Sequence, residues 1–183
     1  TYLSYHCRNT AYDSVIYHEY GHFIDDRMGV IPYSALGYGL SEGWGDTIAA
    51  LTSGMSILGQ DFFGPGTYVR NADNDYVYNP RDEIHAMGQA WSGFNWEYFR
   101  ALLTRYGPEW GEMLAKQEIF GSLAANASSI PQAVVAVAEL DDDDGNLLNG
   151  TPNFDLIQAA ANRHGIGYMI SAVPTVFIDP VTS

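Results

Sequence analysis

Residues 11–29 read AYDSVIYHEYGHFIDDRMG, and the fold prediction follows from the helix that this stretch indicates. Its apolar spacing fits a helix from Ala11 to about Met28, with Thr10 or Asp13 as the candidate N-cap and Gly29 beyond the end. Because residues four apart lie above one another on a helix, the two histidines of HEYGH share one face. The first predicted element therefore carries two imidazoles side by side.

This histidine pair predicts a metal site. His18 and His22 can bind one ion, and Glu19 can contact a water on that ion instead of the ion itself. A catalytic zinc needs a third protein ligand and an open fourth position for water. The alternative interpretation is an ordinary polar helix face with solvated histidines.

The third ligand is expected at the start of a second helix. Residues 29–40 contain proline and glycine and are predicted to form a loop, after which a helix begins at the Ser41 N-cap and runs through EGWGDTIAALTSG. Glu42 opens this helix as the candidate ligand. Asp46 lies one turn later on the same face, where it can accept the other ring N–H of His18 and orient that histidine.

The rest of the chain also indicates helices, so the predicted fold class is mainly α. A long segment without periodicity, residues 59–82, is expected to be a functional surface loop. Helices are predicted for residues 83–107, about 109–125, about 131–139, and from Thr151 to just before Gly165. We expect one domain over residues 1–168 and an extended tail or linker over 169–183.

The charge balance excludes several classes of partner. The chain has 8 Lys and Arg against 22 Asp and Glu, a net charge of -14 that repels phosphate backbones and anionic lipid head groups. Nucleic-acid and membrane-surface partners are therefore not expected. The sequence has no apolar run of the length of a membrane span, so no membrane insertion is expected either. Its single cysteine excludes an internal disulfide.

HEYGH followed by SEGWGD resembles the gluzincin zinc metallopeptidases, with the histidine, glutamate and aspartate spacing of their thermolysin-like members. NTAYDSVIYHEYGH, IHAMGQAWSGFNWEYF and NGTPNFDLI are similar to fungalysin-like secreted peptidases, and the likeness covers roughly residues 9 to 164. The resemblance implies a zincin-type catalytic domain in a secreted or extracellular endopeptidase that acts on peptide or protein substrates. Zinc would bind His18, His22 and Glu42, and Glu19 would be the general base for the attacking water.

The same resemblance implies residues that stabilise the oxyanion. Relatives carry a histidine near the start of a later helix, which here corresponds to His85 in IHAMG. They also carry a tyrosine before the ligand glutamate; an ungapped count gives Tyr33, and Tyr38 is the alternative. The aspartate that precedes the family's histidine is missing at its usual spacing. Asp82 or Glu83 takes its place, or the pairing is lost.

One departure from the family concerns the region before HEYGH. The family motif normally follows a long β-rich half, but only seventeen residues precede His18 here. The upstream β-sheet is therefore expected to be largely absent. Either the chain is a fragment of a longer parent with further domains, or it is a minimal relative.

The acidic run LDDDDGNLLNGTPN, residues 140–153, suggests calcium, which prefers carboxylate and amide oxygens. It does not fit an EF-hand, because Leu140 and Thr151 would occupy the first and last ligand positions. A different calcium loop could use Asp141, Asp142, Asp143, Asp144 and Asn146. The alternatives are a solvated turn and, for the protein as a whole, a non-catalytic calcium-binding or interaction module.

Overall fold

The structure, a computed structural model, describes residues 11–28, 34–168 and 170, and these residues are mainly helical. The helices are α1 (Asp13–Met28), α2 (Ala35–Ser53), α3 (Ile84–Tyr106), α4 (Pro108–Gly121), α5 (Ile130–Asp141) and α6 (Phe154–Arg163), with short 3-10 helices η1 (Ser122–Ala125) and η2 (Leu147–Asn149). Strands β1 (Ile57–Leu58) and β2 (Arg70–Asn71) form an antiparallel pair. The mainly α fold class is confirmed for the described residues. The tail predicted over 169–183 lies outside them, except for residue 170.

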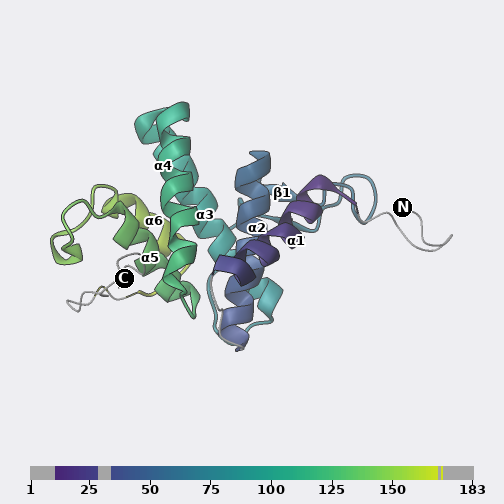
Figure 1. Cartoon of the computed structure of the whole chain (residues 1–183). Coiled ribbons are helices and arrows are strands. Elements are labelled where there is room, and N and C mark those ends of the chain that lie inside the picture. The colour runs from purple at the N-terminus through teal and green to yellow at the C-terminus, as the bar shows by residue number, and fades with distance from the viewer. Residues whose placement is uncertain (1–10, 29–33, 169, 171–183) are drawn as a thin grey trace, which may run out of the picture.

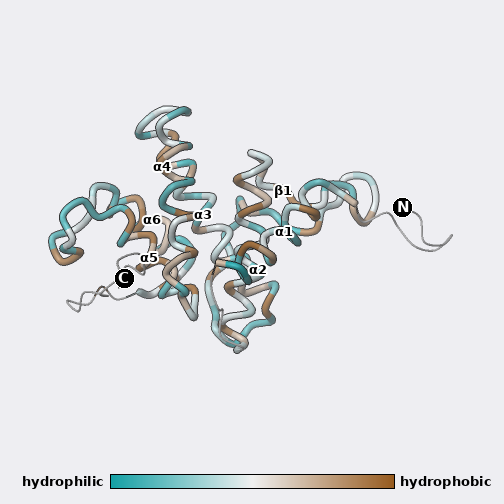
Figure 2. Tube along the Cα trace, viewed as in Figure 1, coloured by the Kyte–Doolittle hydropathy of each residue, from teal (hydrophilic) through white to brown (hydrophobic). Residues whose placement is uncertain are grey.

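Helix α3 lies between two groups of elements (Figure 1). α1, α2 and the β1–β2 pair lie on one side, and α4, α5 and α6 lie on the other. Trp91, Phe94 and Tyr98 on α3 are fully buried, and their rings stack in order with centroids 5.3 and 6.2 Å apart. Figure 2 shows hydrophobic and hydrophilic residues along the same helices, as expected where one face of each helix is in the core. Within the described residues, no helix combines the length and the hydrophobicity of a membrane-spanning segment.

The predicted start of the second helix is wrong. The N-cap of α2 is Ser34, whose side chain accepts a hydrogen bond from the Gly37 backbone N–H at 3.0 Å. Ser41 therefore lies inside the helix. One of the glycines that favoured a loop, Gly39, has a packing role instead, because a Cβ there would lie 2.5 Å from the sulfur of Met87 on α3.

The first helix begins slightly later than predicted. The Tyr12 carbonyl accepts the first helical hydrogen bond from the Ile16 N–H at 2.9 Å, so Tyr12 occupies the N-cap position. Asp13 is consequently in the first turn and is not the cap. The other candidate, Thr10, and the loop residues 29–33 lie outside the described part of the chain.

The last helix starts at Phe154, three residues after the predicted Thr151. The Asp141 carboxylate at the end of α5 accepts hydrogen bonds from the Thr151 hydroxyl, from the Asn153 backbone N–H at 2.6 Å and from the Asn153 amide at 2.7 Å. These bonds hold residues 151–153 in a turn. The helix begins only after this turn.

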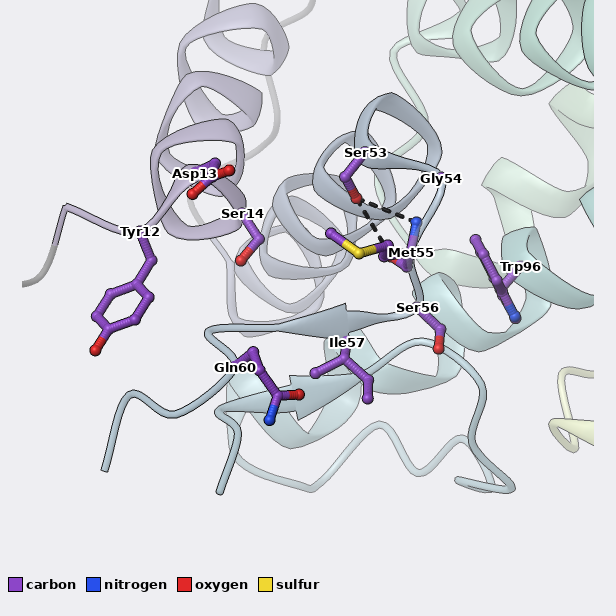
Figure 3. A pocket seen from close by; sticks show the side chains of 10 residues that line it. All are labelled: Tyr12, Asp13, Ser14, Ser53, Gly54, Met55, Ser56, Ile57, Gln60 and Trp96. Atoms are coloured by element: carbon purple, nitrogen blue, oxygen red, sulfur yellow. Dashed lines mark hydrogen bonds between the residues drawn. The ribbon is translucent and has the colours of Figure 1, made fainter. Parts of the chain in front are cut away.

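The long loop predicted over residues 59–82 is confirmed, except that β2 within it pairs with β1. Two hollows are lined by residues of this pair. Ile57 lines a hollow of about 470 Å³ between the start of α1 and the end of α2, with Trp96 on its far wall (Figure 3). Leu58, the next residue along β1, lines the cleft that contains His18.

A buried carboxyl group links α3, α4 and α5. Glu118 on α4 is 1 % exposed and accepts a hydrogen bond from the Tyr98 hydroxyl of α3. Burial raises the pKa of Glu118 to about 7; the neighbouring Asp141 adds to this rise, and the Tyr98 hydrogen bond opposes it. The folded protein therefore keeps a proton at a pH where the unfolded chain has already lost it.

This proton makes stability depend on pH. Between pH 4.5 and about 7 the native state holds a proton that the unfolded state releases. We expect Glu118 to contribute a decrease of roughly 3 kcal/mol in the free energy of unfolding as the pH rises through that interval. Glu118→Gln should remove this slope, because its amide can still accept from Tyr98 and donate towards Asp141. Urea unfolding of both proteins across the interval measures the effect.

The control is Glu109→Gln, on the exposed first turn of the same helix, which should keep the wild-type slope. If Glu118→Gln also keeps the full slope, the titrating group is not Glu118.

Candidate metal centre

The contact between α1 and α2 brings the three predicted ligands together. The Nε2 atoms of His18 and His22 are 3.1 Å apart. The Glu42 carboxylate faces both rings, with Oε2 at 3.5 Å from the His18 Nε2 and Oε1 at 3.6 Å from the His22 Nε2. The sequence placed two of these atoms on one helix face, and the packing of α2 adds the third.

Two glycines allow the helices to approach this closely. A Cβ at Gly21, inside HEYGH, would lie 2.8 Å from the Cα of Gly45. A Cβ at Gly45, inside EGWGD, would lie 2.6 Å from the Nδ1 of His18. Both distances are shorter than real Cβ contacts, so the ligand separations depend on the absence of side chains here.

The structure places Asp46 beside His18, where the sequence analysis expected it. Its Oδ1 lies 2.7 Å from the Nδ1 of His18, and its side chain is almost fully buried. Arg70 on β2 donates to the same carboxylate, from Nε to Oδ2 at 2.6 Å and from Nη2 to Oδ1 at 2.8 Å. This pairing keeps Asp46 ionised and acceptor-only, so the His18 Nδ1 donates to Asp46 and its Nε2 is the ring nitrogen that faces His22 and is available to a metal ion.

Arg70 is a site residue that the sequence alone did not identify. The only signal was its place in the loop over 59–82, which also contains Arg81. The antiparallel pairing of β2 with β1 places its guanidinium beside Asp46 and at 3.7 Å from the Glu42 carboxylate.

His22 has a different set of neighbours. Its Nδ1 lies 3.1 Å from the Ser41 hydroxyl, and Ser41 also interacts with the side chain of Asp25 on α1. Asp25 is 5 % exposed. Burial, together with the charge of Asp26, raises the pKa of Asp25 to about 6, while the bond to Ser41 opposes that rise. Asp25 and Ser41 are further site residues that the sequence did not indicate.

The carboxylates around the two rings favour one positive charge between them. Burial alone would lower the pKa of His18, but its hydrogen bond to Asp46 and the nearby Glu42 carboxylate raise it to about 9. Burial and the charge of His18 then lower the pKa of His22. Without an ion, the pair therefore carries one proton more than two neutral imidazoles, at a position where a metal cation would supply positive charge instead.

The donor set fits zinc. Two imidazole nitrogens and one carboxylate oxygen are a usual zinc ligand set, and ligands at about 2.0–2.1 Å in a tetrahedral site lie about 3.3 Å from one another. The observed separations of 3.1, 3.5 and 3.6 Å are close to this value. In addition, Glu42 Oε2 is buried and has no hydrogen-bond partner among the described residues. A cation at the centre of the triad would satisfy this oxygen.

The triad opens into a cleft of about 300 Å³, called here the metal cleft. Its lining comprises Val15, His18, Glu19, His22, Glu42, Leu58, Phe62, Phe63, Val69, Arg70 and His85. Glu19 is exposed and lies on the next position of α1 after His18, so its carboxylate is available to a molecule in the cleft. The segment from β1 to β2 supplies an apolar wall opposite these polar groups.

The structure places His85 at the metal cleft and decides which acid pairs with it. His85 Nε2 lies 3.5 Å from Glu42 Oε1, and His85 Nδ1 lies 2.5 Å from Glu83 Oε1. Glu83 is also the N-cap of α3. The other candidate, Asp82, instead accepts hydrogen bonds from the Tyr76 hydroxyl and from a neighbouring asparagine.

Of the two tyrosine candidates, only Tyr38 belongs to the part of the chain that the structure describes. Tyr33 lies outside the described residues. Tyr38 lies on α2 one turn before Glu42, with 44 % of its surface exposed, and does not line the metal cleft. The choice between them therefore stays a prediction.

The acidic run between α5 and α6 assembles only part of the predicted calcium group. Three carboxylates have oxygen atoms within 4.8 Å of one another, those of Asp142, Asp143 and Asp144. Asp141 binds Thr151 and Asn153 instead, and the Asn146 side chain accepts from the Leu148 N–H at 3.3 Å. Calcium at the three remaining aspartates stays a prediction.

No protein-family model matches this chain, and a sequence search finds no matching curated protein. An assignment of function therefore depends on the residues and geometry of the metal centre.

Proposed function

We propose that this protein is a zinc-dependent endopeptidase of the gluzincin type. The observation that carries the proposal is the triad of His18, His22 and Glu42, which opens into a cleft that also contains Glu19 and His85. A structural zinc site usually has four protein ligands, whereas three ligands beside a cleft leave a position for water. This arrangement favours hydrolysis over a purely structural ion.

Zinc bound by this triad would polarise the scissile carbonyl and lower the pKa of a water molecule towards neutrality. Glu19 then acts as the general base: its carboxylate takes a proton from the attacking water and passes it to the leaving amine. Asp46 keeps the His18 ring in one orientation, and Arg70 holds Asp46 by two hydrogen bonds.

His85 is the residue proposed to stabilise the oxyanion. Its Nδ1 is held by Glu83, so the opposite ring nitrogen faces the cleft beside Glu42. A protonated Nε2 in this position can donate a hydrogen bond to the oxygen on which negative charge develops.

The walls of the metal cleft fit a peptide with an apolar side chain beside the cleaved bond. Leu58, Phe62 and Val69 form an apolar surface next to the triad, and Arg70 adds a donor at its edge. Apolar pockets with a few polar groups are typical of ligand sites. Secretion, as in the peptidases that the sequence resembles, belongs to the same proposal.

Metal analysis combined with hydrolysis tests the proposal. Protein purified without added metal should contain about one zinc per chain. It should cleave casein or internally quenched peptides, lose activity to a chelator and regain it with zinc. His18→Ala should lose both zinc and activity. Calcium alone with no hydrolysis would support the non-catalytic module instead, and zinc without hydrolysis would retain the metal site but overturn the peptidase.

A further inference from the structure

The two histidine ligands are held in different ways. His18 contacts the Asp46 carboxylate directly, and Arg70 neutralises that carboxylate. His22 contacts the Ser41 hydroxyl at 3.1 Å, and Ser41 in turn contacts Asp25. The second histidine thus also reaches a carboxylate, but through a serine.

The direction of each hydrogen bond in this chain follows from the chemistry of the groups. An imidazole that binds a cation through Nε2 carries its proton on Nδ1, so His22 donates to the Ser41 oxygen. The serine hydrogen must then be given to another acceptor. Asp25 is the acceptor that contacts Ser41, and an ionised carboxylate can only accept.

Asp25 is a buried carboxylate at the contact between two helices. It is 5 % exposed, on the face of α1 that meets α2, one turn after His22. Burial of a carboxylate is costly unless it is hydrogen-bonded. An apolar residue would be the less costly choice on a helix face that packs against another helix.

We propose that Asp25 is a positioning residue for the metal centre, which acts through Ser41 to orient His22 and to strengthen its binding of the metal ion. The inference rests on the proposed function only in requiring zinc at the triad; peptide hydrolysis is not needed. Hydrogen-bond partners of this kind fix the orientation of the ring and increase its basicity as a ligand.

Zinc affinity of the purified, metal-free protein, measured by competition with a chromophoric chelator, tests this role. Asp25→Asn and Ser41→Ala are each expected to weaken zinc binding by about 10- to 100-fold, as is typical for loss of such partners. Ser41→Thr keeps the hydroxyl and should bind zinc nearly as tightly as the wild type. Asp13→Asn, at an exposed acid in the first turn of α1 and with the same charge change, is the matched control and should not alter the affinity.

A double variant shows whether Asp25 and Ser41 act on His22 as one chain of contacts, called the relay, or have two independent effects. Because Asp25 acts only through Ser41, the variant with both Asp25→Asn and Ser41→Ala should bind zinc no more weakly than Ser41→Ala alone. The visible spectrum of the cobalt-substituted protein gives a second readout and should change with the orientation of His22. Asp25→Leu distinguishes a role in packing from a role in positioning His22. Leucine can pack between the two helices but cannot accept a hydrogen bond from Ser41, so this variant should still bind zinc more weakly.

The proposal is overturned if Ser41→Ala or Asp25→Asn binds zinc as tightly as the wild type does, or if Asp25→Leu keeps full zinc affinity. It is also overturned if the losses of zinc affinity in the two single variants add up in the double variant. These results would leave the proposed peptidase intact. Absence of hydrolysis with the relay effects present would overturn only the peptidase, and a wild type that binds no zinc would overturn both.

Discussion

Replacing Glu19 with Gln is expected to abolish peptide hydrolysis while zinc stays bound. The amide cannot take a proton from the attacking water, but it leaves the triad of His18, His22 and Glu42 unchanged. General-base catalysis contributes about 10²- to 10⁴-fold, so we expect kcat/KM to fall by about a thousandfold. Cleavage of an internally quenched peptide measures the rate, and metal analysis of the same sample measures the zinc content.

The matched control for this variant is Asp26→Asn. Asp26 lies on the same helix, is exposed, and does not line the metal cleft, so its loss of charge should leave the activity unchanged. A Glu19→Gln protein with full activity would exclude Glu19 as the general base. Loss of zinc together with activity would instead assign Glu19 a role in metal binding.

Gly21→Ala is expected to disturb both the fold and the metal centre. Alanine favours a helix over glycine by about 1 kcal/mol. Its methyl group, however, would lie 2.8 Å from the Cα of Gly45, where backbone cannot give way without moving a helix. Overpacking costs about 1–3 kcal/mol or more, so we expect a net loss of about 2 kcal/mol in the free energy of unfolding.

The effect on zinc should be the larger one. The contact of Gly21 with Gly45 sets the distance from the histidines on α1 to Glu42 on α2, so separation of the helices removes the third ligand. Urea unfolding of the metal-free protein and chelator competition measure the two effects independently. Gly167→Ala, whose methyl group would meet open space, should change neither. A Gly21→Ala protein with wild-type stability and zinc affinity would show that this contact does not hold the helices together.

Helix periodicity explains what could be predicted from the sequence. His18, Glu19 and His22 lie within five residues of one helix, so their relative positions follow from local geometry alone. Glu42 and Asp46 are related by one turn in the same way. The helix over residues 83–107 was predicted nearly to its ends, because Glu83 caps it and Gly107 follows it.

The start of α2 illustrates what local signals cannot decide. Ser34 and Ser41 are both acceptable N-caps, and the glycines between them indicate a loop when only the sequence is considered. Packing against α3 decides the matter, because the glycine at position 39 leaves room for Met87. Ser41 is thereby placed inside the helix, where it contacts His22.

The sequence by itself determined the mainly helical fold class and the pairing of His18 with His22 on one helix face, because both depend on spacings of three and four residues along single helices. Only the tertiary structure decided how these residues are supported. The approach of Gly21 to Gly45, the contact of Arg70 with Asp46 and the contact of Asp25 with Ser41 join segments far apart or on different helices. Such contacts result from the packing of whole elements, and no local pattern in the sequence encodes them.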